Sequence, residues 1–148
     1  MKKSTISETP ALFIDTWGWL CLADAGDPAH EAAKQTYRRY AGAGRLVTTD
    51  YVLDEMMTRL FSKCPFKPAR AFWNAVRQSA LKGILTIEWI GPDRFDKAVS
   101  LRFRYRDKPR ISFTDLTSFV VMKELRLRDV LTGDQHFAAV QLGFRILP

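Results

Sequence analysis

The chain has 148 residues, of which 47% are hydrophobic and 26% are charged, a balance typical of one globular domain with a real core. No run approaches the roughly 20 apolar residues that a membrane-spanning helix requires, so we expect neither a membrane protein nor a secretory signal, and a cytoplasmic location is predicted. The 23 Lys and Arg exceed the 16 Asp and Glu by +7, which suits a polyanionic partner but is also common in small soluble domains.

Two cysteines and two histidines limit the chemistry of the chain. Cys21 and Cys64 lack CxxC spacing, and we expect both to be reduced. His30 and His136 lie far apart in the sequence, so a zinc site of the His/Cys type is not expected. Residues 1–10 are expected to form a flexible terminal segment ahead of a single domain over residues 11–148.

Short apolar runs alternate with segments of helical spacing along the chain. In chain order we expect a strand over 11–14, helices over 16–23 and 30–40, a strand over 46–49, helices over 51–61 and 69–81, a strand over 84–90, a helix from 91 that ends before Lys108-Pro109, a helix over 114–125, a strand over 130–131, a helix over 134–140 and a strand over 144–147. This alternation predicts an α/β domain with a mostly parallel sheet.

Single residues with strong local preferences set several of these boundaries. Asp50 is expected to cap the helix that follows it, because an Asp before a helix accepts hydrogen bonds from free N–H groups. The segment Cys64–Pro68 is expected to separate two helices. The helix that begins at residue 91 is expected to place four apolar residues on one face, namely Phe95, Ala98, Val99 and Phe103.

Four acidic residues stand where hydrophobic runs stop, namely Asp15, Glu55, Asp115 and Asp134. Asp15 and Asp134 follow apolar strands, whose carboxyl ends form the ligand-binding edge of an open α/β sheet. Glu55 and Asp115 fall near the starts of helices, whose positive dipole ends point toward the same edge. Four carboxylates on one edge repel one another, and a divalent cation such as Mg²⁺ or Mn²⁺ removes that repulsion. The pattern therefore predicts a metal site of hard oxygen ligands.

Structural interpretations of three of these acids stay open. Asp15 could simply cap the helix that follows it. Asp134 ends a Thr-Gly-Asp turn and could likewise cap the helix that follows. Near Asp115, Ser112 or Thr114 could cap the helix instead, which would leave the carboxylate of Asp115 free for a ligand.

Four segments, in this order, resemble the motifs of a known family. They are Phe13-Ile14-Asp15-Thr16, Thr48-Thr49-Asp50-Tyr51-Val52-Leu53-Asp54-Glu55, Ile111-Ser112-Phe113-Thr114-Asp115 and Leu131-Thr132-Gly133-Asp134-Gln135-His136-Phe137. Over about residues 11–148 the chain is similar to PIN-domain ribonucleases, and most of all to the VapC toxins of bacterial and archaeal toxin–antitoxin pairs. The resemblance implies a three-layer α/β/α fold with a central, mostly parallel sheet, usually as a homodimer.

The resemblance also implies roles for individual residues. The metal-binding and catalytic acids would be Asp15, Glu55, Asp115 and Asp134, and the supporting hydroxyls would be Thr16, Ser112, Thr114 and Thr132. It favours Glu55 over its neighbour Asp54, which we expect to face solvent. The implied activity is that of an Mg²⁺-dependent endoribonuclease, with Mn²⁺ as an alternative, restrained by a small antitoxin protein.

The chemistry of such a site does not itself distinguish RNA from DNA. Attack of metal-activated water on phosphorus, in line with the leaving 3′ oxygen, needs no 2′-hydroxyl. The assignment to RNA therefore comes from the resemblance. A non-catalytic PIN-like module that binds RNA or protein is the alternative, although the presence of all four acids favours catalysis.

Two other α/β enzyme classes fit the chain poorly. A haloacid-dehalogenase-type phosphatase needs a second Asp two residues after the first, and this chain has Trp17 there. A phosphoacceptor receiver domain needs an acidic pair after its first strand and a Lys after a later strand, where this chain has Asp134.

A run of positive charge precedes Asp115 and consists of Arg102, Arg104, Arg106, Lys108 and Arg110. These side chains could bind RNA phosphates, or they could form a solvated helix end favoured by the helix dipole. Three aromatic residues near Asp15, namely Phe13, Trp17 and Trp19, could stack on bases. Aromatic residues at this spacing more often belong to a core or to a protein interface, and we favour that interpretation.

Overall fold

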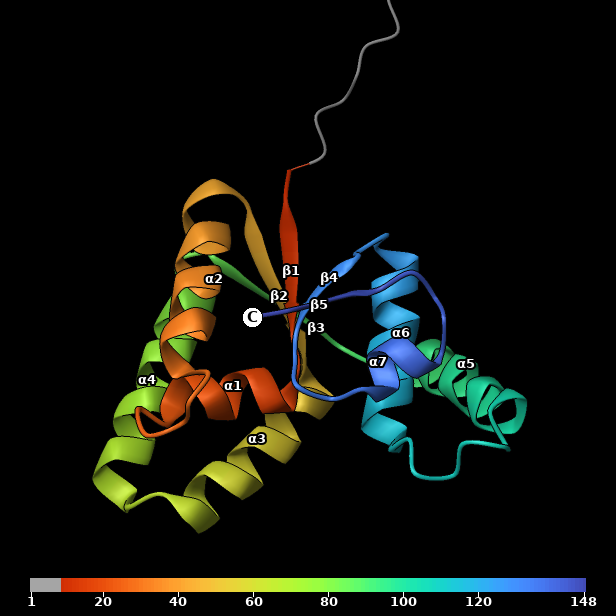
Figure 1. Ribbon diagram of the computed structural model, residues 1–148, viewed down its shortest axis with the longest axis horizontal. Helices are drawn as coiled ribbons and strands as arrows, with labels where there is room; N and C mark the ends of the chain where they lie inside the picture. Colours follow the sequence, from red (N-terminus) through yellow and green to blue (C-terminus); the bar gives the residue numbers. More distant parts are fainter. Residues whose placement is uncertain (1–8) are drawn as a thin grey trace, which may run out of the picture.

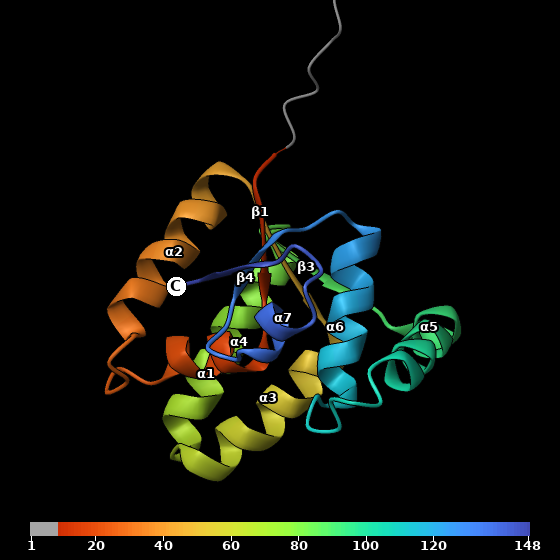
Figure 2. The same ribbon diagram turned by 45° about the vertical axis from the view of Figure 1, so that its right-hand side comes forward.

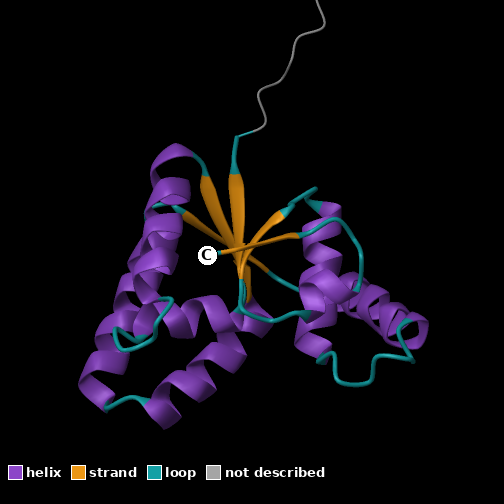
Figure 3. Cartoon of the chain, in the orientation of Figure 1, coloured by secondary structure: helices purple, strands orange, loops and turns teal. Residues whose placement is uncertain are grey.

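Five strands form one parallel sheet in a computed structural model, which describes residues 9–148 (Figure 1). They are β1 (Ala11–Ile14), β2 (Arg45–Thr49), β3 (Leu85–Glu88), β4 (Asp129–Leu131) and β5 (Arg145–Leu147), in the spatial order β3-β2-β1-β4-β5. Residues 1–8 of the expected flexible segment lie outside the described residues. Each neighbouring pair of strands runs parallel, which confirms the predicted sheet (Figure 3).

Helices cover both faces of this sheet. They are α1 (Thr16–Ala23), α2 (His30–Ala43), α3 (Asp50–Lys63), α4 (Phe66–Leu81), α5 (Gly91–Arg104), α6 (Phe113–Glu124) and α7 (His136–Ala139). In Figure 1 α1, α2 and α4 lie on one side of the strands, and α5, α6 and α7 lie on the other; Figure 2 shows α2 and the pair α5 and α6 on opposite sides of the strands from a second direction. Helix α3 contacts both α1 and α6 and so connects the two layers. The predicted three-layer α/β/α fold is therefore confirmed.

The strand order identifies the ligand-binding edge of the sheet. From β1 the chain proceeds outward to β2 and β3, and it then returns to place β4 on the opposite side of β1. Phe13 of β1 accordingly pairs with Val47 of β2 and with Val130 of β4. In open α/β sheets, ligands bind beyond the carboxyl ends of the strands where the order reverses. Here that crevice lies between the ends of β1 and β4, which are followed by Asp15 and Asp134.

Two predicted helix boundaries are wrong. Asp50 is the first residue of α3, and Thr49 caps this helix by accepting a hydrogen bond from the Val52 N–H at 3.1 Å. The carboxylate of Asp50 instead accepts a hydrogen bond from the Ile90 N–H at 2.9 Å. The predicted break between helices is present at Cys64 and Pro65, but α4 begins at Phe66 and not at Ala69, so Pro68 lies in its first turn. A proline is tolerated there because the first N–H groups of a helix have no intrahelical acceptor.

The predicted apolar face of α5 is only partly buried. Ala98 is buried against the core, whereas Phe95 and Phe103 are 42% and 72% exposed. Phe95 packs its ring edge-on against Phe113 of the neighbouring helix α6. The spacing was helical, but the helix contacts the domain through one narrow stripe, so Phe103 is left largely in solvent and Phe95 is partly covered by Phe113.

Two glycines allow α1 to approach the end of β4 closely. A Cβ atom at Gly18 would stand 2.4 Å from the carbonyl oxygen of Leu131, and one at Gly133 would stand 2.4 Å from the Trp17 ring. Any larger residue would therefore force the two segments apart. Since Asp15 opens α1 and Thr132 follows β4, these contacts bring the two residues together.

The aromatic residues near Asp15 belong mainly to the protein interior. Phe13 and Trp19 are buried in the core, and the Trp19 indole N–H donates a hydrogen bond to the hydroxyl of Thr48. Trp17 is half-buried beside Gly133. Cys21 and Cys64 are both free thiols, as predicted. Among the described residues, no helix has the length and apolar content to cross a membrane.

Candidate metal centre

Asp15 is a buried carboxylate that does not cap its helix. It occupies the N-cap position of α1, but its side chain makes no capping hydrogen bond. The side chain is 3% exposed, and its Oδ2 accepts a hydrogen bond from the Thr132 hydroxyl at 2.9 Å. Its Oδ1 is buried and has no hydrogen-bond partner within residues 9–148. Burial, helped by the charges of Asp134 and Glu55, raises the pKa of Asp15 from 3.8 to about 6.

Asp115 is the second buried carboxylate, in the first turn of α6. Ser112 caps this helix, because its hydroxyl accepts a hydrogen bond from the Asp115 N–H at 3.0 Å. The carboxylate is therefore free of a capping role. Burial raises the pKa of Asp115 from 3.8 to about 8, and the charges of Asp15, Asp134 and Glu55 raise it further. The structure thus brings all four predicted acids into electrostatic range of one another.

Glu55 and Asp134 form the half-buried rim of this group. Glu55, in the second turn of α3, accepts a hydrogen bond from the Thr16 hydroxyl at 3.2 Å and pairs with Arg59 at 2.8 Å. Its neighbour Asp54 is exposed, as predicted. Asp134 accepts a hydrogen bond from the His136 N–H at 2.9 Å, so it does serve the turn before α7 as the sequence suggested. Its charge still acts on both buried carboxylates.

The four predicted hydroxyls have different surroundings. Thr132 donates to Asp15 and also accepts a hydrogen bond from the Asp134 N–H at 3.0 Å, so it links two of the acids. Thr16 donates to Glu55, and Ser112 caps α6. Thr114 lies directly before Asp115, and its carbonyl oxygen accepts hydrogen bonds from the hydroxyls of Thr117 and Ser118.

His136 is a neighbour of the site that the sequence did not single out. Its Nδ1 lies 3.4 Å from an oxygen of Asp115 and 3.2 Å from an oxygen of Asp134. Among the described residues, ligand atoms of Asp115, Asp134 and His136 all lie within 4.8 Å of one another. Adjacent ligands of an octahedral ion with bonds of about 2.1 Å lie about 3 Å apart, so this spacing is compatible with a shared ion.

The residues present fit a divalent cation. A buried oxygen of Asp15 lacks a partner within residues 9–148, and two buried carboxylates face two further acids. A small hard cation is the partner that carboxylates in this arrangement prefer. The donors that could hold it are Asp15, Asp115, Asp134, Glu55 and the Nδ1 of His136.

The five residues of the predicted basic run have different surroundings in the structure. The Arg102 guanidinium donates hydrogen bonds to the carbonyl oxygens of Tyr105, Lys108 and Ile111, and it thereby holds the loop between α5 and α6. Arg104, Arg106 and Arg110 are exposed. Lys108 and Arg110 line a hollow of about 330 Å³ whose wall also includes His136. Lys108 and Arg110 therefore lie near His136, where Lys108 already pairs with Asp107 at 2.8 Å, while Arg102 stabilises the loop that carries both.

Comparison with known proteins identifies the family. The PIN domain family model matches residues 12–142 of the chain. The chain belongs to the PIN-domain family. The 23S rRNA-specific endonuclease VapC20 of Mycobacterium tuberculosis is 30% identical over 128 residues, which make up 86% of this chain and 92% of the relative.

Solved structures agree with this membership. The crystal structure of Mycobacterium tuberculosis VapC20, a Sarcin-Ricin loop cleaving toxin, matches with a TM-score of 0.78 at 30% identity and covers 93% of this chain and 99% of that one. VapBC2 from Rickettsia felis, bound to a DNA fragment from its promoter, matches with a TM-score of 0.69 at 11% identity over 92% of this chain and 96% of that one. The second likeness shows the fold alone. The prediction of a VapC-type PIN-domain nuclease is confirmed.

Proposed function

We propose that the four carboxylates are the catalytic centre of an Mg²⁺-dependent endoribonuclease that acts as the toxin of a VapBC-type pair. The observation that carries this proposal is the pair of buried carboxylates, Asp15 and Asp115, whose pKa values are raised, together with the Asp15 Oδ1 that has no hydrogen-bond partner within residues 9–148. Such a pair is unfavourable in a folded protein unless a cation binds to it. Mn²⁺ is an alternative ion for the same ligands.

Each residue of the site has a distinct task in this proposal. Asp15 and Asp115 would hold the ion together with Asp134, Glu55 and His136. Thr132 and Thr16 orient Asp15 and Glu55 through the hydrogen bonds that they donate. When bound, the divalent ion activates water and neutralises charge on the phosphodiester. Lys108 and Arg110, beside His136, would hold neighbouring phosphates and so position the bond between phosphorus and the 3′ oxygen for hydrolysis.

The substrate class that we propose is folded RNA, and ribosomal RNA in particular. The relative VapC20 is specific for 23S rRNA, and the net charge of +7 on this chain favours a large polyanion. We also propose a cognate antitoxin protein as the partner, a homodimer as the assembly and the cytoplasm as the location.

Cleavage of purified ribosomal RNA tests the proposal directly. We expect the wild-type chain to produce discrete fragments with Mg²⁺ or Mn²⁺ and none with EDTA, and we expect Asp15→Asn to abolish them. Asp54→Asn is the matched control, because Asp54 is an exposed acid beside Glu55 and should cleave like wild type. Equal cleavage by wild type and Asp15→Asn would reject the site. The non-catalytic alternative predicts RNA binding without fragments for every variant.

A further inference from the structure

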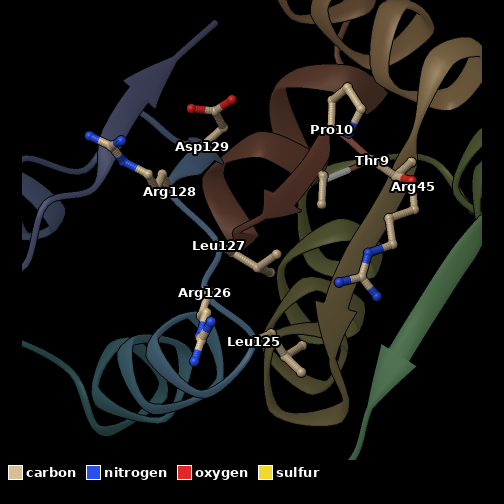
Figure 4. Close-up of a pocket in the computed structure, with 9 residues that line it drawn as sticks. Thr9, Pro10, Arg45, Leu125, Arg126, Leu127, Arg128 and Asp129 are labelled. Atoms are coloured by element: carbon tan, nitrogen blue, oxygen red, sulfur yellow. The ribbon is translucent and has the colours of Figure 1, made fainter. Parts of the chain in front are cut away.

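A second hollow lies at the amino edge of the sheet, at the opposite ends of the strands from the carboxylates (Figure 4). This amino-edge hollow has a volume of about 560 Å³. It is bounded by Thr9–Ala11 at the start of β1, by Arg45 at the start of β2, and by residues 125–129, which lead from α6 into β4.

Positive charge dominates the amino-edge hollow. Arg45, Arg126 and Arg128 line it from two separate segments, and Figure 4 shows Arg45 on one side of Leu127 and Arg126 and Arg128 on the other, with the Arg128 side chain pointing away from Arg45. All three are exposed, and within residues 9–148 their side chains make no ion pair or hydrogen bond. The acid among the described lining residues is Asp129, which accepts hydrogen bonds from Arg145 at 2.7 and 2.8 Å and one from Tyr40. Its charge is therefore already balanced from outside the hollow.

The backbone gives a second reason to regard Arg126 as a functional side chain. Arg126 follows the C-cap of α6 and has a φ of 56°, in the left-handed region. Glycine or asparagine is favoured at that helix position, because other side chains are strained there. The chain carries an arginine at this site, and that arginine lines the hollow (Figure 4).

The residues that line the hollow favour a nucleic acid over other polyanions as its ligand. Guanidinium groups bind phosphates in bidentate fashion and also stack on bases. Pro10, Leu125 and Leu127 form an apolar part of the wall, which suits an unstacked base better than an acidic peptide.

We infer that the amino-edge hollow is a second RNA-binding site, which holds phosphates of a folded RNA while another part of that RNA is cut at the carboxyl edge. This inference rests on the proposed function. Pro10 and Asp15 stand at opposite ends of β1, and five residue steps in a strand separate them by roughly 16 Å. A compact RNA hairpin with flanking strands can contact both edges, whereas a strand of a few nucleotides contacts one.

A binding measurement with matched variants tests the inference. One variant combines Arg45→Gln, Arg126→Gln and Arg128→Gln, and the control combines Arg38→Gln, Arg70→Gln and Arg77→Gln. The control residues are exposed arginines on α2 and α4, so both variants lose the same charge. Affinity for a fluorescein-labelled RNA hairpin is measured by fluorescence anisotropy in EDTA over a range of KCl concentrations, after thermal melting has verified that both variants fold.

The hollow variant should bind the hairpin on the order of tenfold more weakly than wild type, with a salt dependence shallower by about two counterions. The control variant should bind within about twofold of wild type. Equal losses of RNA affinity in the two variants would overturn the inference. The three arginines would then bind a different partner, such as an acidic protein.

Cleavage of a short single-stranded RNA separates this inference from the proposed function. With Mg²⁺ both arginine variants should cleave it at the wild-type rate, because it reaches only the carboxyl edge. If wild type cleaves no RNA, the proposed function fails, and the anisotropy comparison still decides whether the hollow binds RNA. A cleavage loss confined to the hollow variant would contradict an RNA site separate from the catalytic edge.

Discussion

Asp15 and Asp129 lie at opposite edges of the same sheet and have opposite surroundings. Asp129, at the start of β4, accepts hydrogen bonds from Arg145 and Tyr40. Burial opposes its ionisation, but these hydrogen bonds and the charge of Arg145 outweigh burial and lower the pKa of Asp129. Asp15, beyond the end of β1, has the Thr132 hydroxyl as a partner, and burial raises its pKa to about 6.

We expect this difference between an acid that stabilises the fold and one that binds a metal ion. The chain supplies Asp129 with a cation of its own, so its charge stabilises the fold. It places further acids near Asp15 and Asp115, and Arg59 pairs with Glu55 at the rim. We therefore propose that Asp15 and Asp115 bind a cation from solution. Replacement of Asp129 and replacement of Asp15 or Asp115 should then have different consequences.

The largest expected effect is on catalysis. Asp115→Asn should lower the rate of RNA cleavage on the order of 10³-fold, because it removes a buried ligand of the ion. Asp129→Asn should cleave at close to the wild-type rate per folded molecule, since Asp129 lies at the other edge of the sheet. Rates are measured with Mg²⁺ under single-turnover conditions. Similar losses in both variants would remove the distinction between the two edges.

The next effect is on the pH dependence of stability without metal. The pKa values of Asp15 and Asp115 are raised from 3.8 to about 6 and about 8, so the native state holds these protons more tightly than the unfolded chain. Their contribution is fully present below about pH 4 and is lost as pH rises through about 6 and 8. For Asp15 alone the loss is about 3 kcal/mol.

Chemical denaturation in EDTA at a series of pH values measures this loss. Asp15→Asn should show a shallower decline than wild type, and saturating Mg²⁺ should flatten the wild-type curve. Parallel curves for wild type and Asp15→Asn would show that burial does not perturb this carboxyl.

At the amino edge we expect a smaller change in the free energy of unfolding, opposite in sign to the change at Asp15. Asp129→Asn should lower the free energy of unfolding at neutral pH by about 2 kcal/mol, because it breaks charge-assisted hydrogen bonds to Arg145. Asp15→Asn in EDTA should be at least as stable as wild type under the same conditions. Urea denaturation of the two variants gives both values, and destabilisation by Asp15→Asn alone would reverse the comparison.

The smallest effect concerns His136. His136→Gln should weaken Mn²⁺ binding by about tenfold, because Nδ1 lies beside oxygens of both Asp115 and Asp134. Calorimetric titration measures the affinity, and pulsed electron paramagnetic resonance of bound Mn²⁺ detects a nitrogen ligand. His30→Gln, at a distant histidine, is the control. Unchanged Mn²⁺ affinity in His136→Gln, with no nitrogen coupling to Mn²⁺ in wild type, would show that His136 only forms hydrogen bonds and does not bind the ion.

Sequence reasoning located the acids because a carboxylate that ends an apolar run is visible without coordinates. Asp15 and Asp134 end runs that became β1 and the β4 segment, and parallel strands must bring those ends to one edge. The fold class followed from the same alternation of strands and helices. Which acids would be buried depended on packing, including the close approach of α1 to β4 at Gly18 and Gly133.

Other features depended on contacts between distant segments. His136 has no periodic signal, and its position within the motif after Asp134 was the only clue to its place in the site. Arg102 looked like its basic neighbours, because a sequence does not reveal that the loop turns three carbonyl oxygens toward it. Asp50 had the preference of a helix cap, but Thr49 already supplied the cap, and the Ile90 N–H provided Asp50 with another partner.

Titration of the metal-free protein with Mn²⁺ at neutral pH tests the assignment of the carboxyl edge most directly. Wild type and Asp129→Asn should bind the ion with the same affinity, and Asp115→Asn should show no saturable binding in the same range. Binding that persists unchanged in Asp115→Asn, or that is lost in Asp129→Asn, would contradict a metal centre built on the buried pair.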